Sequence, residues 1–394
     1  MPGWLRTSKT DTPKNPFLQA DPLTRLLLGR LGLKVWVAVL LTLIVPIIPV
    51  YVMVFVNHLA MIDPGACPKN VFTADCLSIG LLKDYGWFWY QFVSWPATIL
   101  FFFWFPKGIF GAIQTLKEHK VLLPSPSASG DQDITQFTAR FAQSYSHPIW
   151  LLVSFIALTA FMGFYFLPAQ QTYKVWTTSG WFIFWYTQLF HSFILFTVFL
   201  IAARSTVVVV GFNLLFRKFP PDVNFLHPDK AGGLFPFGNL IVKGGYFIGM
   251  YGCTLLVLIM EAPYRRGEAV IVMQPEVIPM AVLYLLFAPT LFYLALRSAH
   301  LAMEKARNDF VMNIANRYKE KINSLKISLV SSDLDKVKAS TEELEQLKRI
   351  HALASDYPIW PIDTRNIIRF FTSYLAPVAF AISLAFVIKL LGLN

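Results

Sequence analysis

The chain has 394 residues, of which 55% are hydrophobic and only 14% are charged. Because soluble domains carry roughly 25% charged residues, this composition excludes a soluble globular protein and is typical of a multi-pass membrane protein. The formal net charge of +11 raises the alternative of a nucleic-acid surface. However, no basic run with interleaved aromatic residues occurs, so we expect no nucleic-acid partner.

Residues 1–34 carry six basic and two acidic side chains, without a clean apolar core or a small-residue cleavage site. We therefore expect this segment to be retained rather than removed as a signal peptide. Asp21 before Pro22 is a typical helix start, with an N-cap followed by proline at the first helical position. The helix that follows is predicted to lie on the cytoplasmic membrane surface and to bind lipid headgroups through Arg25, Arg30 and Lys34.

Seven apolar stretches are each about as long as the ~20 residues that cross the hydrocarbon core of a bilayer. Charged side chains lie only near their ends, which disfavours proton-coupled carriers and intramembrane proteases. The sequence thus predicts an all-α polytopic membrane protein, with six transmembrane helices within residues 35–296 and a seventh within 357–394. The stretches run over 35–56, 87–105, 148–167, 181–203, 240–260, 277–296 and 367–388.

The connections between these stretches divide the charge unequally. One alternate set, which includes the N-terminus, holds 28 of the 34 Lys and Arg residues and 17 of the 23 Asp and Glu residues, while the other set has no net charge. Since positively charged loops stay inside, we expect a cytoplasmic N-terminus and a periplasmic or extracellular C-terminus. Cys67 and Cys76 then fall in one exterior loop, where a disulfide between them is permitted.

Residues 297–356 form the most distinctive connection, because apolar residues recur every three or four positions in two runs. Ser331 and Ser332 separate the runs, so we expect two helices in an antiparallel cytoplasmic hairpin. The first helix would continue the sixth transmembrane helix directly. Such a hairpin is either a solvated coiled coil that packs only on itself, or a stalk for oligomerisation or signal input that binds a cytoplasmic protein.

Few polar side chains lie within the apolar stretches. Gln188 and His191 share a helical face in the fourth stretch, and Cys253 and Thr254 are neighbours in the fifth. Residues of this kind either form hydrogen bonds between helices or line a pore and contact a ligand. Prolines in the first, second, sixth and seventh stretches bend those helices and favour an internal cavity.

Two cytoplasmic segments, before the fifth and the seventh stretch, combine prolines, aromatic residues and acids. In the first, Asp222, His227 and Asp229 offer carboxylate and imidazole ligands for a divalent cation, although their spacing matches no known metal motif. The alternative is that they form turns and cap helices. In the second segment, Asp363 is placed to cap the seventh helix and Trp360 to anchor it at the membrane interface. The functional alternative is that the two segments meet as a cytoplasmic gate, with the candidate residues Asp222, His227, Asp229, Gly232, Gly233, Trp360, Asp363 and Arg365.

The strings HPDKAGGL and YPIWPIDTR in these segments resemble parts of uncharacterised bacterial multi-pass membrane proteins. The resemblance is limited to these two strings; it implies a bacterial inner (plasma) membrane and no particular activity. The sequence contains no nucleotide-binding loop, GxSxG elbow, HExxH pair or potassium-filter motif, and we expect no cofactor.

Three functions remain open. The leading one is a homo-oligomeric channel or pore for ions or small solutes, gated through the cytoplasmic hairpin. The second is a non-conducting sensor or scaffold that recruits a cytoplasmic partner. The third is a membrane-embedded enzyme that modifies lipid and uses Asp222, His227 and Asp229; since no catalytic motif supports it, the sequence favours a protein that is not an enzyme.

Overall fold

The chain is described here from a computed structural model, in which all regular structure is helical. The residues that it describes are 15–19, 24–62, 77, 79–123, 130–170, 175–223, 227, 229, 231–266, 278–330, 334–355, 359–362 and 364–390. Within these ranges there is no β-strand, and only two isolated β-bridges occur. The predicted all-α class is therefore confirmed for the described part of the chain.

The helices follow one another with short connections. The larger ones are α3 (Val35–Val56), α5 (Trp95–Glu118), α6 (Gly130–Tyr145), α7 (Ile149–Phe161), α9 (Trp181–Lys218), α10 (Phe235–Arg266), α11 (Ile278–Val330), α12 (Leu334–Ser355) and α13 (Thr364–Leu390). Smaller ones are α1 (Pro16–Gln19), α4 (Tyr85–Trp89), α8 (Leu167–Gln170), the π-helical turns η2 (Arg25–Arg30), η4 (Tyr90–Ser94) and η5 (Met162–Phe166), and the 3-10 turns η3 (Leu81–Lys83) and η6 (Trp176–Thr178).

Six helical segments in the described part of the chain are long and apolar enough to cross a membrane. They are Val35–Val56, Tyr85–Glu118, Asp133–Phe164, Trp181–Lys218, Phe235–Met260 and Tyr284–Lys326, and they overlap the first six predicted stretches. This confirms a multi-pass membrane protein. Helix α13 covers the seventh predicted stretch but is not among the six.

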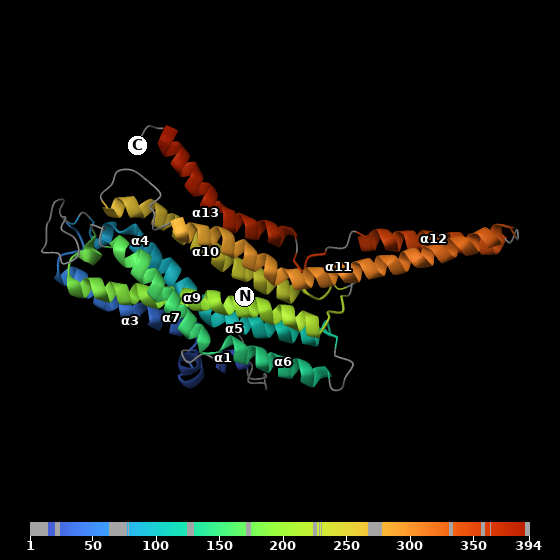
Figure 1. The fold of residues 1–394 in the computed structure, drawn as a ribbon, viewed down its shortest axis with the longest axis horizontal. Helices are drawn as coiled ribbons and strands as arrows, with labels where there is room; N and C mark the ends of the chain where they lie inside the picture. Colours follow the sequence, from blue (N-terminus) through green and yellow to red (C-terminus); the bar gives the residue numbers. More distant parts are fainter. Residues whose placement is uncertain are drawn as a thin grey trace.

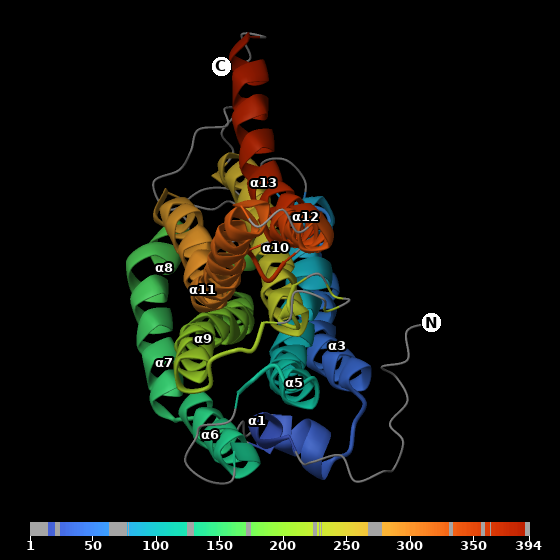
Figure 2. The same cartoon turned by 90° about the vertical axis from the view of Figure 1, so that its right-hand side faces the viewer.

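The bundle is built around α5, α9 and α10, with α3 and α7 on opposite flanks (Figures 1 and 2). The interior is rich in stacked aromatic rings; for example, the ring centres of Trp95 and Phe190 lie 3.9 Å apart. On α3, large apolar side chains such as Trp36, Val45 and Val56 are exposed. A helix that is apolar all round is suited to a lipid environment, so these faces are expected to contact lipid tails.

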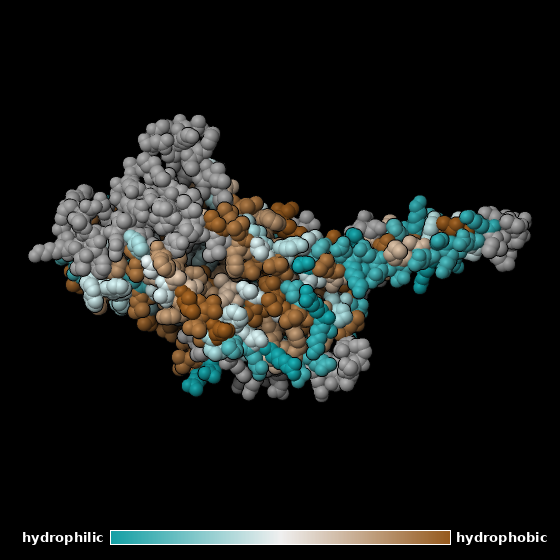
Figure 3. Space-filling model, viewed as in Figure 1, coloured by the Kyte–Doolittle hydropathy of each residue, from teal (hydrophilic) through white to brown (hydrophobic). Residues whose placement is uncertain are grey.

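Helices α11 and α12 lie side by side and extend beyond the bundle (Figure 1). An ion pair between Lys321 Nζ and Glu343 Oε2, 2.6 Å apart, joins them. The surface of this pair is largely hydrophilic, whereas the described surface of the bundle shows broad apolar areas (Figure 3). The pair therefore suits an aqueous environment outside the bilayer.

Helices α10 and α13 approach each other closely because glycines on α10 leave room for side chains of α13. A Cβ on Gly245 would collide with the ring of Phe370, and one on Gly249 would press on the backbone of Ser373. Phe370 also stacks on Phe292 of α11, with ring centres 3.8 Å apart. The first half of α13 is thus held between α10 and α11, whereas its second half diverges from the bundle (Figure 1).

The structure differs from the sequence analysis at two places. No helix was predicted directly before the third stretch, but α6 begins at Gly130, and Ile134 and Phe141 on α6 are buried against the bundle. The fourth stretch was expected to end at Ala203, but α9 continues to Lys218, because the residues after Arg204 are again largely apolar and Val208, Phe212 and Leu215 are buried. Cys67 and Cys76 lie outside the described residues.

Candidate functional site

Gln188 and His191 lie in the first half of α9, where the sequence predicts that they share a helical face. Gln188 is only 2% exposed, and neither its Nε2 nor its Oε1 has a hydrogen-bond partner within the described chain. His191 Nδ1 lies 2.9 Å from the carbonyl oxygen of Thr187. The imidazole is surrounded by aromatic rings, with ring centres 4.8 Å away at Tyr90 and 5.4 Å away at Trp87.

The other two intramembrane candidates have separate surroundings on α10. Thr254 Oγ1 accepts a hydrogen bond from Trp89 Nε1 at 3.2 Å and lies 2.8 Å from Ser94 Oγ. Thr254 thus links α10 to the start of the α4–α5 segment. Cys253, its neighbour, is half-buried and is the only free cysteine within the described residues. The structure therefore gives Thr254 a role in helix packing.

Sequence reasoning missed four residues of the α4–α5 segment, of which Trp87 and Tyr90 contact the ring of His191. Trp87 Nε1, Tyr90 Oη, Gln91 Nε2 and Trp95 Nε1 are buried and have no hydrogen-bond partner within the described chain. Together with Gln188 they form what we call the polar layer, defined as Trp87, Tyr90, Gln91, Trp95 and Gln188. Of this layer, the sequence analysis identified Gln188; Gln91, a polar residue in an apolar stretch, was the other signal that pointed to it.

The backbone near the polar layer is also unusual. Residues Tyr90–Ser94 form the π-helical turn η4 between the α-helices α4 and α5. Single π-helical turns of this kind occur frequently at functional sites, because they change the direction of the side chains that follow. Two members of the polar layer, Tyr90 and Gln91, lie in this turn.

Two charged residues are buried within the bundle. Asp84 is 1% exposed; it accepts hydrogen bonds from the Trp87 backbone N–H at 2.9 Å and from Trp176 Nε1 at 3.0 Å. Arg204 is 2% exposed, and its guanidinium lies 5.0 Å from the centre of the Tyr145 ring. Arg204 lies about 35 Å along α9 from Trp181, and Asp84 is the N-cap residue of α4.

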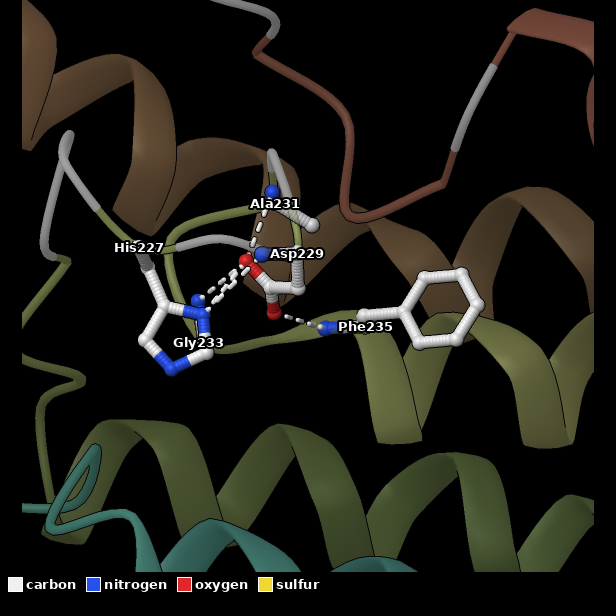
Figure 4. A network of polar contacts seen from close by, with 5 residues as sticks. All are labelled: His227, Asp229, Ala231, Gly233 and Phe235. Atoms are coloured by element: carbon white, nitrogen blue, oxygen red, sulfur yellow. Dashed lines mark hydrogen bonds and ion pairs between the residues drawn. The ribbon is translucent and has the colours of Figure 1, made fainter.

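His227 and Asp229 of the HPD string lie in a compact turn around the carboxylate of Asp229 (Figure 4). One carboxylate oxygen, Oδ1, accepts from His227 Nδ1 at 2.8 Å. Backbone N–H groups supply the other hydrogen bonds, at 2.9 Å from Ala231, 3.1 Å from Gly233 and 3.3 Å from Phe235. Burial raises the pKa of Asp229, but these donors outweigh it and hold the pKa below its ordinary value.

The geometry of this turn is that of a helix cap. The donor at Phe235 is the first residue of α10, and the turn requires glycine because Gly232 and Gly233 have φ values of +65° and +91°. A side chain at Gly233 would also collide with Val121 from the loop after α5. The HPDKAGGL string thus specifies a tight, capped entry to α10.

Asp222 does not join this network. Its side chain is exposed, while its backbone N–H donates to the Val121 carbonyl at 2.7 Å. The ring of His119 lies near that of His227, with centres 5.5 Å apart. In the described part of the chain, no group of three or more His, Cys, Asp or Glu side chains is arranged to hold a metal ion.

The second of the two segments, at residues 359–362, packs where α11 leaves the bundle. Trp360 stacks on the ring of His300 with centres 4.1 Å apart, and His300 Nδ1 lies 2.8 Å from the carbonyl oxygen of Ile359. Gly238 of α10 packs against the Pro361 backbone so closely that a Cβ would overlap it. The two segments are therefore in contact at this point. Asp363 and the side chain of Arg365 lie outside the described residues.

Comparison with known proteins adds no functional information. No protein-family model, no curated protein sequence and no solved structure matches this chain. Function is therefore inferred from the residues and their geometry.

Proposed function

We propose that the protein is a homo-oligomeric channel or pore for ions or small solutes in a bacterial inner (plasma) membrane. In this proposal the N-terminus is cytoplasmic, α13 is the seventh crossing with an exterior C-terminus, and α11 and α12 form the cytoplasmic hairpin that gates the pore. The unequal division of Lys and Arg between alternate connections supports this orientation.

The observation that carries the proposal is the continuity of α11. Its 53 residues form one helix, about 80 Å long, whereas the hydrocarbon core of a bilayer is only about 30 Å thick. One continuous helix, with Pro289 inside its membrane part, thus reaches from within the apolar bundle to the distant contact with α12. A force on the pair would tilt the membrane part of α11 as well.

The contacts of the membrane part of α11 support a gating role. Phe292 stacks on Phe370, and Tyr284 Oη donates to the Tyr374 carbonyl oxygen at 3.0 Å. Both partners belong to α13, so tilting α11 would disturb its contacts with α13 directly. Where α11 leaves the bundle, the stacked pair of His300 and Trp360 joins it to the segment that leads into α13. These contacts are the ones that a gating movement would have to change.

Flux measurements test this proposal. Liposomes that contain the purified full chain should release entrapped ions or small solutes passively, at a rate that rises with protein density. Deleting residues 331–355 removes all of α12 and should change the gating of that flux while leaving membrane insertion intact. If no ion or small solute crosses faster than in protein-free liposomes under any stimulus, the channel proposal is wrong.

One observation favours the alternative of a non-conducting sensor or scaffold. Large apolar side chains, including Met312, Tyr318 and Ile350, are exposed on α11 and α12, far from the lipid-facing surface. Exposed apolar groups on a polar surface are typical of partner-binding sites. If this alternative holds, one cytoplasmic protein should co-purify with the wild type but not with Ile350→Lys, and no flux should accompany it.

A further inference from the structure

The polar layer contains several buried hydrogen-bonding groups that have no hydrogen-bond partner within the described chain. Six side-chain atoms are involved: Trp87 Nε1, Tyr90 Oη, Gln91 Nε2, Trp95 Nε1, Gln188 Nε2 and Gln188 Oε1. Buried polar groups are nearly always hydrogen-bonded, because leaving one unpaired loses the hydrogen bonds that it made in water. Several unpaired groups in one layer therefore indicate a ligand that enters the bundle and forms hydrogen bonds with them.

Ring contacts join three of these residues, Trp87, Tyr90 and Trp95, to two neighbouring rings on α9. Trp87 and Tyr90 both lie against His191, and Trp87 and Trp95 both lie against Phe190. Gln188 is one helical turn before His191 on α9. Gln91 Oε1 accepts a hydrogen bond from Tyr51 Oη at 3.3 Å. The Nε2 of the same amide can still donate.

The chemistry of the layer suits an uncharged ligand. Its five side chains supply N–H and O–H donors and, at Gln188 Oε1, an amide acceptor, but none of them carries a charge. The nearby carboxylate of Asp84 is held by Trp176 and by the Trp87 backbone, and it would repel an anion. A bare cation would have to give up its water shell for a layer made mostly of donors.

We infer that the polar layer binds small uncharged polar solutes, of the urea, amide or polyol class, and selects them over ions. The inference rests on the proposed channel function and names its substrate class. Gln188 would pair with both a donor and an acceptor of the solute, while the indole N–H groups and Tyr90 would pair with its oxygen atoms. The aromatic rings around the layer would restrict the path to small molecules.

Stopped-flow light scattering on liposomes that contain the full chain tests this assignment, with urea and glycerol as probes and a separate assay for K⁺ and Cl⁻ flux. The wild type should speed urea or glycerol entry over protein-free liposomes without conducting either ion. Gln188→Met keeps the size of the side chain but removes the amide. It should slow solute entry about tenfold, since each ~1.36 kcal/mol on a barrier changes a rate tenfold.

Two further variants make the outcome decisive. Gln143→Met, at an exposed position on α6, should leave solute entry unchanged. Tyr90→Phe keeps the aromatic ring and removes only the hydroxyl, so it should slow entry even if Gln188→Met fails to fold. Ion flux without solute flux would overturn this assignment but not the channel. Absence of both fluxes would overturn both, and unchanged solute entry in Gln188→Met and Tyr90→Phe would overturn the role of the polar layer.

Discussion

Gln188 is the residue at which a structural role and a binding role predict opposite effects on stability. If its amide joined two helices, replacing it would lose that hydrogen bond and destabilise the fold. In the structure the amide makes no such bond, so removing it removes a buried group that nothing in the described chain satisfies. We therefore expect Gln188→Met to have an unchanged or higher Tm in detergent without added solute. A clearly lower Tm would favour a structural hydrogen bond.

Asp229 provides a pH-dependent prediction. Its folded pKa is depressed by the backbone donors around it, so its contribution to stability is present above the unfolded pKa and is lost as the pH falls through the folded pKa. The wild type should lose Tm as the pH falls from 5 toward 3. Asp229→Asn should have a lower Tm at neutral pH and a flatter pH profile in this range, as measured by thermal unfolding in detergent. Equal slopes for the two proteins would contradict the cap.

For single residues, the sequence predicted a role where the pattern that indicates it is local in the chain. Asp229 was identified both as a site candidate and as a turn former or cap, because an HPD string before two glycines is a local pattern. The unpaired amide of Gln188 was not predictable, since whether a buried polar atom finds a partner depends on helices far apart in the sequence. Trp87 and Trp95 were missed for the same reason, because a tryptophan in an apolar stretch normally reads as a membrane anchor.

Among the elements, the close approach of α10 and α13 depends on Gly245. Gly245→Leu should destabilise the protein by about 1–3 kcal/mol, the usual cost of overpacking, because the new side chain would displace the Phe370 ring. The matched control is Gly244→Leu, since a Cβ at that position meets nothing within 4 Å. Thermal unfolding should therefore separate the two variants, and equal Tm values would contradict the packing of α13 on α10.

The continuity of α11 is tested by breaking it outside the bundle. Asn313→Pro removes a backbone donor and clashes with the preceding turn, at a cost of about 3 kcal/mol in a helix interior. In a background without native cysteines, spin labels at exposed Ser324 on α11 and exposed Ser144 on α6 should give a narrow distance distribution. The distribution should broaden in Asn313→Pro but not in Asn313→Ala. A broad distribution in the unaltered chain would contradict a rigid arm.

The sequence predicts a helix correctly where an uninterrupted apolar run has clear ends. It fails where a helix continues past a charged residue or begins beside a polar tract. The first stretch matches α3 residue for residue, because a long apolar run has no other stable form in a bilayer. By contrast, α9 continues past Arg204, because this single charge interrupts an apolar run that resumes at Val207 and is buried at Val208 and Phe212. Helix α6 was not predicted, although Ile134, Phe137 and Phe141 recur at helical spacing. The Pro- and Ser-rich tract before it gives no signal for the start of a helix.

The arrangement of the whole molecule separates two environments. Apolar side chains cover α3 and α7, while α11 and α12 present a hydrophilic surface beyond the bundle (Figure 3). Between the lipid-facing flanks, the polar layer lies in the interior, where neither lipid nor bulk water reaches it in the described structure. A channel requires that water enter this layer from at least one side of the membrane.

Cysteine accessibility at Gln188 tests that requirement most directly. In a background without native cysteines, Gln188→Cys and Leu189→Cys place thiols at neighbouring positions of α9, of which Leu189 is 69% exposed on the bundle surface and faces lipid. We predict that a membrane-impermeant, water-soluble thiol reagent labels Gln188→Cys in intact liposomes and does not label Leu189→Cys. Labelling of neither thiol, or of Leu189→Cys alone, would contradict a wet path through the bundle.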